Sequence, residues 1–211
     1  DPQQGVVEGR TFSHPDLRIR FTVPQGYGIQ NGTSAVSIVG SNGQAQFSGG
    51  SYTGDLGTYI ARVFQALGGN QARIPFTQPR STNVNGIPAA YSTARVNSNQ
   101  GQVDVTVFAY RWDSNTAYHF VTITRAGAGL GPFQSMVQSL TRLSASQAAA
   151  IRPRVIDVVT VRSGDTVQSL AGRMAYSDLK TERFLTLNGL PSNARLTPGQ
   201  RVKVVVYGSR T

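Results

Sequence analysis

Apolar and polar positions alternate strictly between Leu17 and Pro24, so this segment is predicted to be a strand with one buried face. The apolar face consists of Leu17, Ile19, Phe21 and Val23. Two more short strands are expected at residues 35–41 and 45–52, because a Ser-Asn-Gly turn separates them. The chain is therefore expected to begin with β structure.

The spacing of apolar residues changes between Gly54 and Gly69, where they recur three and four positions apart, as on a helix. The helix is predicted to end at Gly68-Gly69, since glycine commonly terminates helices. Alternation then returns in three strand patterns, and an Asn-Gly pair in the first of them predicts a hairpin turn. These patterns cover residues 81–96, 102–112 and 117–127.

A second helical stripe follows within residues 131–144. It is formed by Phe133, Met136, Val137 and Leu140. Three or four strands, a helix, three strands and a helix would bury their apolar faces if the helices covered one antiparallel sheet. The predicted fold class is therefore α+β, an antiparallel sheet with flanking helices.

A domain boundary is predicted where an Ala-rich helical end gives way to Arg152-Pro153-Arg154, because Pro153 disfavours helix at the residue before it. A compact unit with the order strand, helix, helix, strand follows. We expect four parts: an N-terminal extension at 1–10, the α+β domain at 11–145, a linker at 146–157, and a small βααβ domain at 158–207.

Composition narrows the classes of function. The net charge is +10, carried almost wholly by Arg, with lysine only at Lys180 and Lys203. Such a chain suits an anionic partner such as nucleic acid, anionic lipid or cell-wall polymer. The basic residues are scattered singly, however, so a solvated basic face is favoured over nucleic-acid binding. Cysteine is absent, which excludes disulfides, thiolate catalysis and Cys-ligated metals.

The ends and the hydropathy of the chain add two expectations. No apolar run approaches the ~20 residues of a membrane helix. The chain starts at Asp1 with neither an initiator Met nor a signal-peptide pattern, so we interpret it as a processed product or a piece of a longer protein.

Catalytic motifs are not found. Zinc-peptidase chemistry needs two His one helical turn apart with a Glu as base, and His14 and His119 are the only histidines. A Ser–His–Asp triad is compatible with the inventory, but no Gly-x-Ser-x-Gly elbow precedes a helix. Tyr110 and Trp112 are expected on one strand face beneath a helix, with Arg111 on the other. We expect no enzymatic activity, metal or cofactor in this chain.

Residues 159–206 resemble a LysM domain, the βααβ module that binds N-acetylglucosamine-containing glycans. The resemblance rests on four motifs in order: Gly164-Asp165-Thr166, Leu170-Ala171, Leu187-Asn188-Gly189-Leu190 and Pro198-Gly199-Gln200. The same residues also have folding roles, since Thr166 can cap the following helix and Asp165 suits its positive end. The predicted core is Val161, Val167, Leu170, Phe184, Leu187 and Val202.

The resemblance implies a sugar-binding groove between two loops, 164–167 and 188–193. The implied glycan-binding residues are Gly164, Asp165, Thr166, Val167, Asn188, Gly189, Leu190 and Pro191. The link between the two helices departs from the family, because residues 171–188 are about three residues longer than usual. We expect these extra residues to lie beside the groove, and the sequence leaves open whether they cover the groove or leave it accessible to sugar.

The whole chain is similar to the C-terminal, non-catalytic region of bacterial envelope zinc metalloproteases of the prenyl-protease-like, BepA-type HExxH family. The similarity rests on the segments 9–27, 85–90 and 182–205, and the first domain is also similar to PsbP-like folds. It implies a periplasmic region that positions an upstream, zinc-containing protease domain on peptidoglycan or on envelope substrates. The alternatives are purely structural or regulatory domains whose LysM unit binds no glycan, and an independent hydrolase without a motif.

Overall fold

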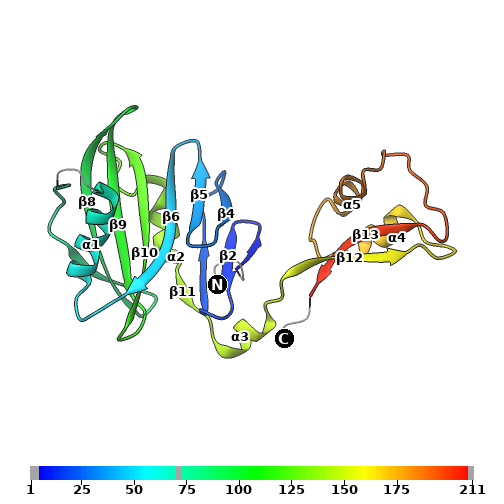
Figure 1. Cartoon of the computed structure of the whole chain (residues 1–211), viewed down its shortest axis with the longest axis horizontal. Helices are drawn as coiled ribbons and strands as arrows, with labels where there is room; N and C mark the ends of the chain where they lie inside the picture. Colours follow the sequence, from blue (N-terminus) through cyan, green and yellow to red (C-terminus); the bar gives the residue numbers. More distant parts are fainter. Residues whose placement is uncertain (1–4, 70–72, 209–211) are drawn as a thin grey trace. The chain divides into compact units, whose positions relative to one another are not determined.

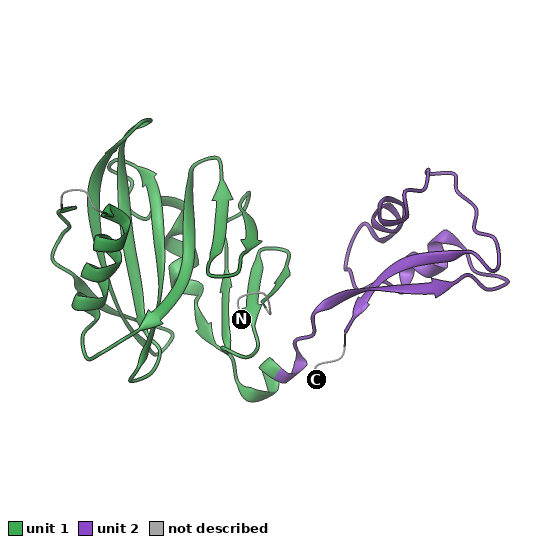
Figure 2. Ribbon diagram, in the orientation of Figure 1, with its two compact units in different colours: residues 1–148 green, residues 149–211 purple. Residues whose placement is uncertain are grey.

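The chain divides into two units, residues 1–148 and residues 149–211 (Figure 2). This computed structural model describes residues 5–69 and 73–208. The division falls within helix α3 (Ala145–Ala150), which lies at the start of the predicted linker. Residues 1–4 of the predicted N-terminal extension lie outside the described residues.

The first unit is built on a seven-stranded antiparallel sheet with the order β4-β5-β6-β10-β9-β8-β7. Its strands are β4 (Gly28–Asn31), β5 (Val36–Gly40), β6 (Gly43–Ser51), β7 (Arg80–Val84), β8 (Ile87–Ser98), β9 (Gly101–Arg111) and β10 (Thr116–Arg125). The predicted hairpin turns are confirmed: β5 returns into β6, and Asn85-Gly86 connects β7 to β8 with both residues at positive φ. Neighbouring strands in the sequence pair locally, whereas β6 pairs with β10 across the helix and the second hairpin.

Helix α1 (Leu56–Gly68) covers one face of this sheet, as predicted from its spacing (Figure 1). The carboxylate of Asp55 accepts hydrogen bonds from the Gly57 and Thr58 N–H groups and so caps the first turn. Tyr59, Ile60 and Phe64 are the buried residues of the helix. They pack on alternate residues of β8, β9 and β10.

The opposite face is covered by a second, smaller sheet and by helix α2 (Gln134–Ser139). The second sheet has the order β1-β2-β3-β11, with β1 (Val6–Glu8), β2 (Thr11–His14), β3 (Ile19–Thr22) and β11 (Thr141–Arg142). The apolar face of β3 is buried as predicted, and the Phe21 ring lies 4.9 Å from that of Phe120 on β10. The main sheet is therefore buried on both faces.

The α+β fold class is confirmed, and several details differ from the sequence pattern. Residues 6–8 of the predicted extension form β1, which pairs with β2. The predicted helix at 131–144 is shorter: a 3₁₀ turn (η2, Gly131–Phe133) leads into α2, which stops before β11. The predicted stripe is nevertheless confirmed, since Phe133, Met136, Val137 and Leu140 are all buried.

The second unit has the predicted βααβ order. It consists of β12 (Arg154–Thr160), α4 (Val167–Gly172), α5 (Lys180–Asn188) and β13 (Arg201–Tyr207). β12 pairs antiparallel with β13, from Arg154 opposite Tyr207 to Thr160 opposite Arg201. β12 thus begins within the predicted linker. Five of the six predicted core residues are buried, and Leu187 is partly buried against them.

No helix in residues 5–69 and 73–208 is long and apolar enough to cross a membrane.

Candidate functional site

The first predicted loop of the groove is a tight turn between β12 and α4. Gly164 has a φ of 90°, a conformation that side chains disfavour. The Asp165 carboxylate accepts a hydrogen bond from the Arg162 N–H at 2.8 Å and lies 3.5 Å from the Arg173 guanidinium. The Asp165 carboxylate therefore stabilises the turn in which it lies.

Thr166 begins α4 with a capping box. Its hydroxyl oxygen accepts the Ser169 N–H at 3.0 Å, and the Ser169 hydroxyl oxygen accepts the Thr166 N–H at 2.9 Å. The predicted cap is confirmed. The Val167 side chain is buried in the core of the unit, so it is not available to a ligand.

The second loop starts at Asn188, whose side chain is fully engaged within the unit. Its amide donates to the Phe184 carbonyl at 3.0 Å and the Lys203 carbonyl at 2.9 Å, and its oxygen accepts the Lys203 N–H at 2.7 Å. Gly189 ends α5 in the left-handed region, and Pro191 is exposed. Leu190 is half-buried against the core. Asn188 is thus a brace between α5 and β13.

The groups of the two loops that are still available to a ligand are mainly backbone N–H and C=O groups. The Gly164 N–H and the carbonyls of Gly164 and Gly189 make no hydrogen bond within the described part of the chain. A Cβ placed on either glycine would meet nothing within 4 Å, so both positions are open. Free N–H and C=O groups in open positions can pair with the acetamido and hydroxyl groups of a sugar.

The longer link between α4 and α5 lies away from the first loop. The Ala175 N–H donates to the Val205 carbonyl, and the Arg154 guanidinium donates to the Ala175 carbonyl. Along the outer edge of β13 the order is Arg201 near the first loop, Lys203 held by Asn188, and Val205 held by the link. Four residues of strand, about 13 Å, separate Arg201 from Val205.

The expectation that the link lies beside the groove is therefore wrong: it packs on the far side of Asn188. Met174 and Ala175 are buried, and both contact Val205: its N–H donates to the Met174 sulfur at 3.4 Å, and its carbonyl accepts the Ala175 N–H. Tyr176 is held between Arg154, 4.8 Å from its ring centre, and Arg183 at 4.4 Å. Arg183 also forms an ion pair with Asp178 at 3.1 Å.

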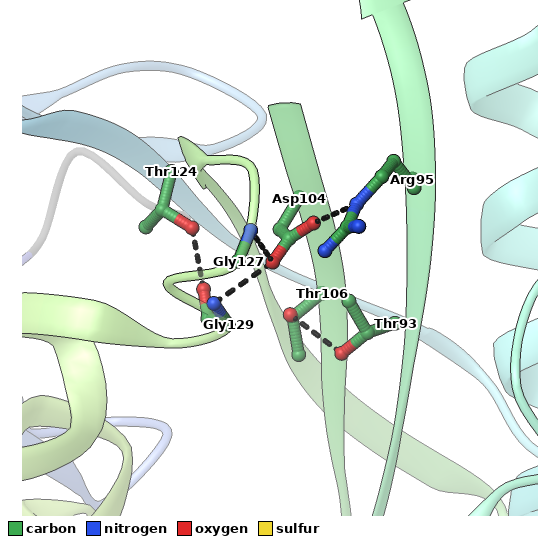
Figure 3. Close-up of polar contacts among 7 residues, drawn as sticks. All are labelled: Thr93, Arg95, Asp104, Thr106, Thr124, Gly127 and Gly129. Carbon is green, nitrogen blue, oxygen red and sulfur yellow. Dashed lines mark hydrogen bonds and ion pairs between the residues drawn. The ribbon is translucent and has the colours of Figure 1, made fainter. Parts of the chain in front are cut away.

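The first unit contains a polar cluster that the sequence did not single out (Figure 3). Buried Asp104 accepts the N–H groups of Gly127 and Gly129, both at 2.9 Å, and the Arg95 guanidinium at 3.1 Å. Burial raises the pKa of Asp104, but these donors outweigh it and the net shift is downward. The carboxylate fastens the loop after β10 to the sheet. In the sequence, the one feature that could have pointed to this cluster is the acidic residue Asp104 within a strand pattern of alternating apolar residues.

The two histidines lie on different sheets. His119 on β10 is 2.7 Å from the Tyr59 hydroxyl under α1, and burial lowers its pKa to about 4. Burial raises the pKa of Tyr59 to about 12, so both rings are neutral at pH 7. His14 on β2 accepts the Leu17 N–H, and its pKa is also lowered, chiefly by burial. Among the described residues, no three His, Asp or Glu side chains gather as metal ligands do.

The predicted placement of Tyr110 and Arg111 is confirmed. The Tyr110 hydroxyl donates to the Val137 carbonyl of α2 at 2.6 Å, so this ring is buried beneath the helix. Arg111 lies on the other face, near the Tyr52 ring. Trp112 is half-buried, with the Arg142 guanidinium 3.9 Å from its ring.

Comparison with known proteins defines the class of the second unit. Residues 159–205 match the sequence profile of the LysM domain family, so this unit is a LysM domain. None of the curated protein sequences compared with the chain matches it.

Two solved structures are distantly similar. A protein from Bacteroides thetaiotaomicron VPI-5482 shares 12% identity over 74% of this chain and 55% of its own, with a TM-score of 0.47. This chain thus spans about half the length of that protein. LpqN of Mycobacterium tuberculosis, which is involved in cell envelope biogenesis, shares 13% identity over 60% of this chain and 83% of its own, with a TM-score of 0.42. Neither likeness is close enough to define the first unit.

Proposed function

We propose that the second unit binds a glycan containing N-acetylglucosamine, such as peptidoglycan, and holds the protein at the bacterial cell envelope. The observation that carries this proposal is the LysM domain at 159–205 with both loop glycines open. The polar side chains of Asp165, Thr166 and Asn188 are engaged in folding, so recognition would use backbone groups of Gly164 and Gly189. The position of the longer link supports the proposal, because it leaves the first loop uncovered.

Co-sedimentation with purified peptidoglycan and titration with chitooligosaccharides test the proposal directly. Saturable binding is expected, with amide chemical-shift changes confined to residues 164–167 and 188–191. Absence of saturable binding to both probes would favour the alternative, in which the LysM unit is purely structural.

A pair of variants tests the location of the site. Pro191→Trp adds a bulky ring at an exposed position in the second loop and is expected to weaken binding. Ser177→Trp adds the same ring to the link, on the far side of Asn188, and is expected to leave affinity unchanged. Equal effects of the two substitutions would contradict the assignment of the groove.

We further propose that the chain is a non-catalytic accessory region of a periplasmic zinc metalloprotease of the BepA type, with the PsbP-like first unit as a second positioning module. The resemblance of the two-domain order to that family supports this proposal. The parent protein would then carry a His-Glu-x-x-His motif upstream of Asp1. A parent sequence without that motif, or substrate turnover by this chain alone, would overturn the assignment.

A further inference from the structure

Three arginines flank the two loops in the sequence. Arg162 begins the first loop, Arg195 follows the second, and Arg201 starts β13 opposite Thr160. Backbone hydrogen bonds join the segment after β12 to the segment before β13. The Val161 N–H donates to the Gln200 carbonyl and the Gly199 N–H donates to the Val161 carbonyl, both at 2.8 Å. Figure 1 shows the segment after α5 leading to the start of β13, at this end of the two-stranded sheet. All three arginines are exposed.

The positive charge at this end is not neutralised within the unit. In the described part of the chain, Arg162, Arg195 and Arg201 form no ion pair. Asp165 is the one carboxylate in the segments 161–166 and 188–201, and it already faces Arg173 at 3.5 Å. The loops therefore present a surplus of guanidinium groups around a site whose other ligand contacts are uncharged backbone groups.

Because a guanidinium presents a planar fork of N–H donors, it pairs well with carboxylate. We infer that the preferred ligand is an anionic, carboxylate-bearing glycan strand, whose carboxylates pair with Arg162, Arg195 and Arg201. This inference rests on the glycan binding proposed above. Neutral polymers of N-acetylglucosamine, which lack those groups, bind more weakly. In peptidoglycan the carboxylates are those of the stem peptides. A lactyl group of the glycan carries a free carboxylate only where its stem peptide has been removed, because the peptide is attached there through an amide bond.

The test compares the affinity of the intact chain for four probes. They are peptidoglycan freed of phosphate polymers, the same material with its carboxyl groups amidated, peptide-stripped glycan strands, and chitooligosaccharide. Affinity is measured at about 0.01 M and about 0.15 M salt, where the Debye length falls from roughly 30 to roughly 8 Å. We expect binding to native peptidoglycan to weaken with salt and with amidation. Removal of the stem peptides frees lactyl carboxylates on the glycan. Retained affinity for peptide-stripped strands therefore shows that a lactyl carboxylate can make the contact, and lost affinity assigns the contact to stem peptides.

The combined substitution Arg162→Gln, Arg195→Gln and Arg201→Gln should weaken binding to native peptidoglycan on the order of tenfold, since exposed ion pairs each contribute little. Arg80→Gln, Arg111→Gln and Arg125→Gln together remove the same charge from the first unit and should leave affinity unchanged. Equal, salt-independent binding to native and amidated peptidoglycan would overturn the inference while glycan binding stands. Absence of binding to any probe would overturn the proposed function itself.

Discussion

The side chain of Asn188 pairs with the backbone of Lys203 in both directions, as a neighbouring strand would. Its amide donates to the Lys203 carbonyl at 2.9 Å, and its oxygen accepts the Lys203 N–H at 2.7 Å. Two residues further along, the Ala175 N–H donates to the Val205 carbonyl. Backbone groups on the outer edge of β13 therefore have hydrogen-bond partners although no third strand is present among the described residues of this unit. A residue of the LysM motif thus holds the two-stranded sheet to its second helix.

Asn188→Ala is expected to lower the free energy of unfolding of the second unit by about 2 kcal/mol, because three hydrogen bonds of roughly 0.5–1.5 kcal/mol each are lost and partly replaced by water. Hydrogen exchange of the amides in 201–207 measures this loss within the intact chain. Asn193→Ala, at an exposed loop position, is the matched control and should change exchange little. Unchanged protection in Asn188→Ala would show that the brace is dispensable.

Thr166→Ala is expected to lower the stability of the second unit by about 1 kcal/mol, since the cap to the Ser169 N–H is lost. Thr166→Ser keeps the hydroxyl and should retain most of the stability. Because the Thr166 oxygen is engaged with Ser169, affinity for peptidoglycan per folded molecule should be equal in both variants. Titration under conditions where both variants are folded checks this, and a selective loss in Thr166→Ala would make the hydroxyl a ligand contact.

Local features of the fold were predictable from the sequence because each depends on residues a few positions apart. The Asn85-Gly86 turn, the α1 stripe ending at Gly68-Gly69 and the Thr166 cap all follow from short-range backbone preferences. The LysM unit was recognisable for the same reason: Gly164 and Pro198-Gly199 are needed by tight turns. These residues identify the fold, and they say little about which side chains face a ligand.

Pairing across long sequence separations was not predictable. β6 meets β10 and β3 meets β11, and no local pattern in either partner specifies the other. β1 was missed because three residues carry too little periodicity. The position of the link was predicted wrongly, since it depends on the burial of Met174 and Ala175 and on their contacts with Val205 of β13.

Asp104→Asn tests whether the polar cluster of Figure 3 holds the loop after β10. The carboxylate accepts two backbone N–H groups and one guanidinium, and hydrogen bonds to a charged group contribute about 1.5–3 kcal/mol each. The neutral amide would present an N–H group toward at least one donor. We expect a loss of about 2–3 kcal/mol in the free energy of unfolding of the first unit.

Fluorescence of Trp112, the single tryptophan, reports unfolding of the first unit selectively. Asp113→Asn is the control for Asp104→Asn, because the exposed Asp113 carboxylate accepts the Asn115 N–H in a local turn. The control should lose less than half as much stability. Equal losses would mean that general charge, rather than the buried cluster, determines the effect.

The contact between half-buried His119 and buried Tyr59 predicts that the first unit loses stability in mild acid. The pKa of His119 is about 4 in the folded protein against 6.5 for an unperturbed histidine, so the unfolded chain takes up a proton before the folded one does. Stability is therefore full above pH 6.5 and falls as the pH drops toward 4. Between pH 7 and pH 5 the loss from His119 should be about 2 kcal/mol.

Denaturant unfolding followed by Trp112 fluorescence at pH 7 and pH 5 measures this loss. His119→Gln removes the titrating group while keeping a polar side chain beside the Tyr59 hydroxyl, and it should flatten the pH dependence between these values. Part of the slope should remain, because burial also lowers the pKa of His14. His14→Gln should remove that remainder. If His119→Gln kept the full slope of the wild-type chain, the ring of His119 would have to be accessible to protons in the folded state.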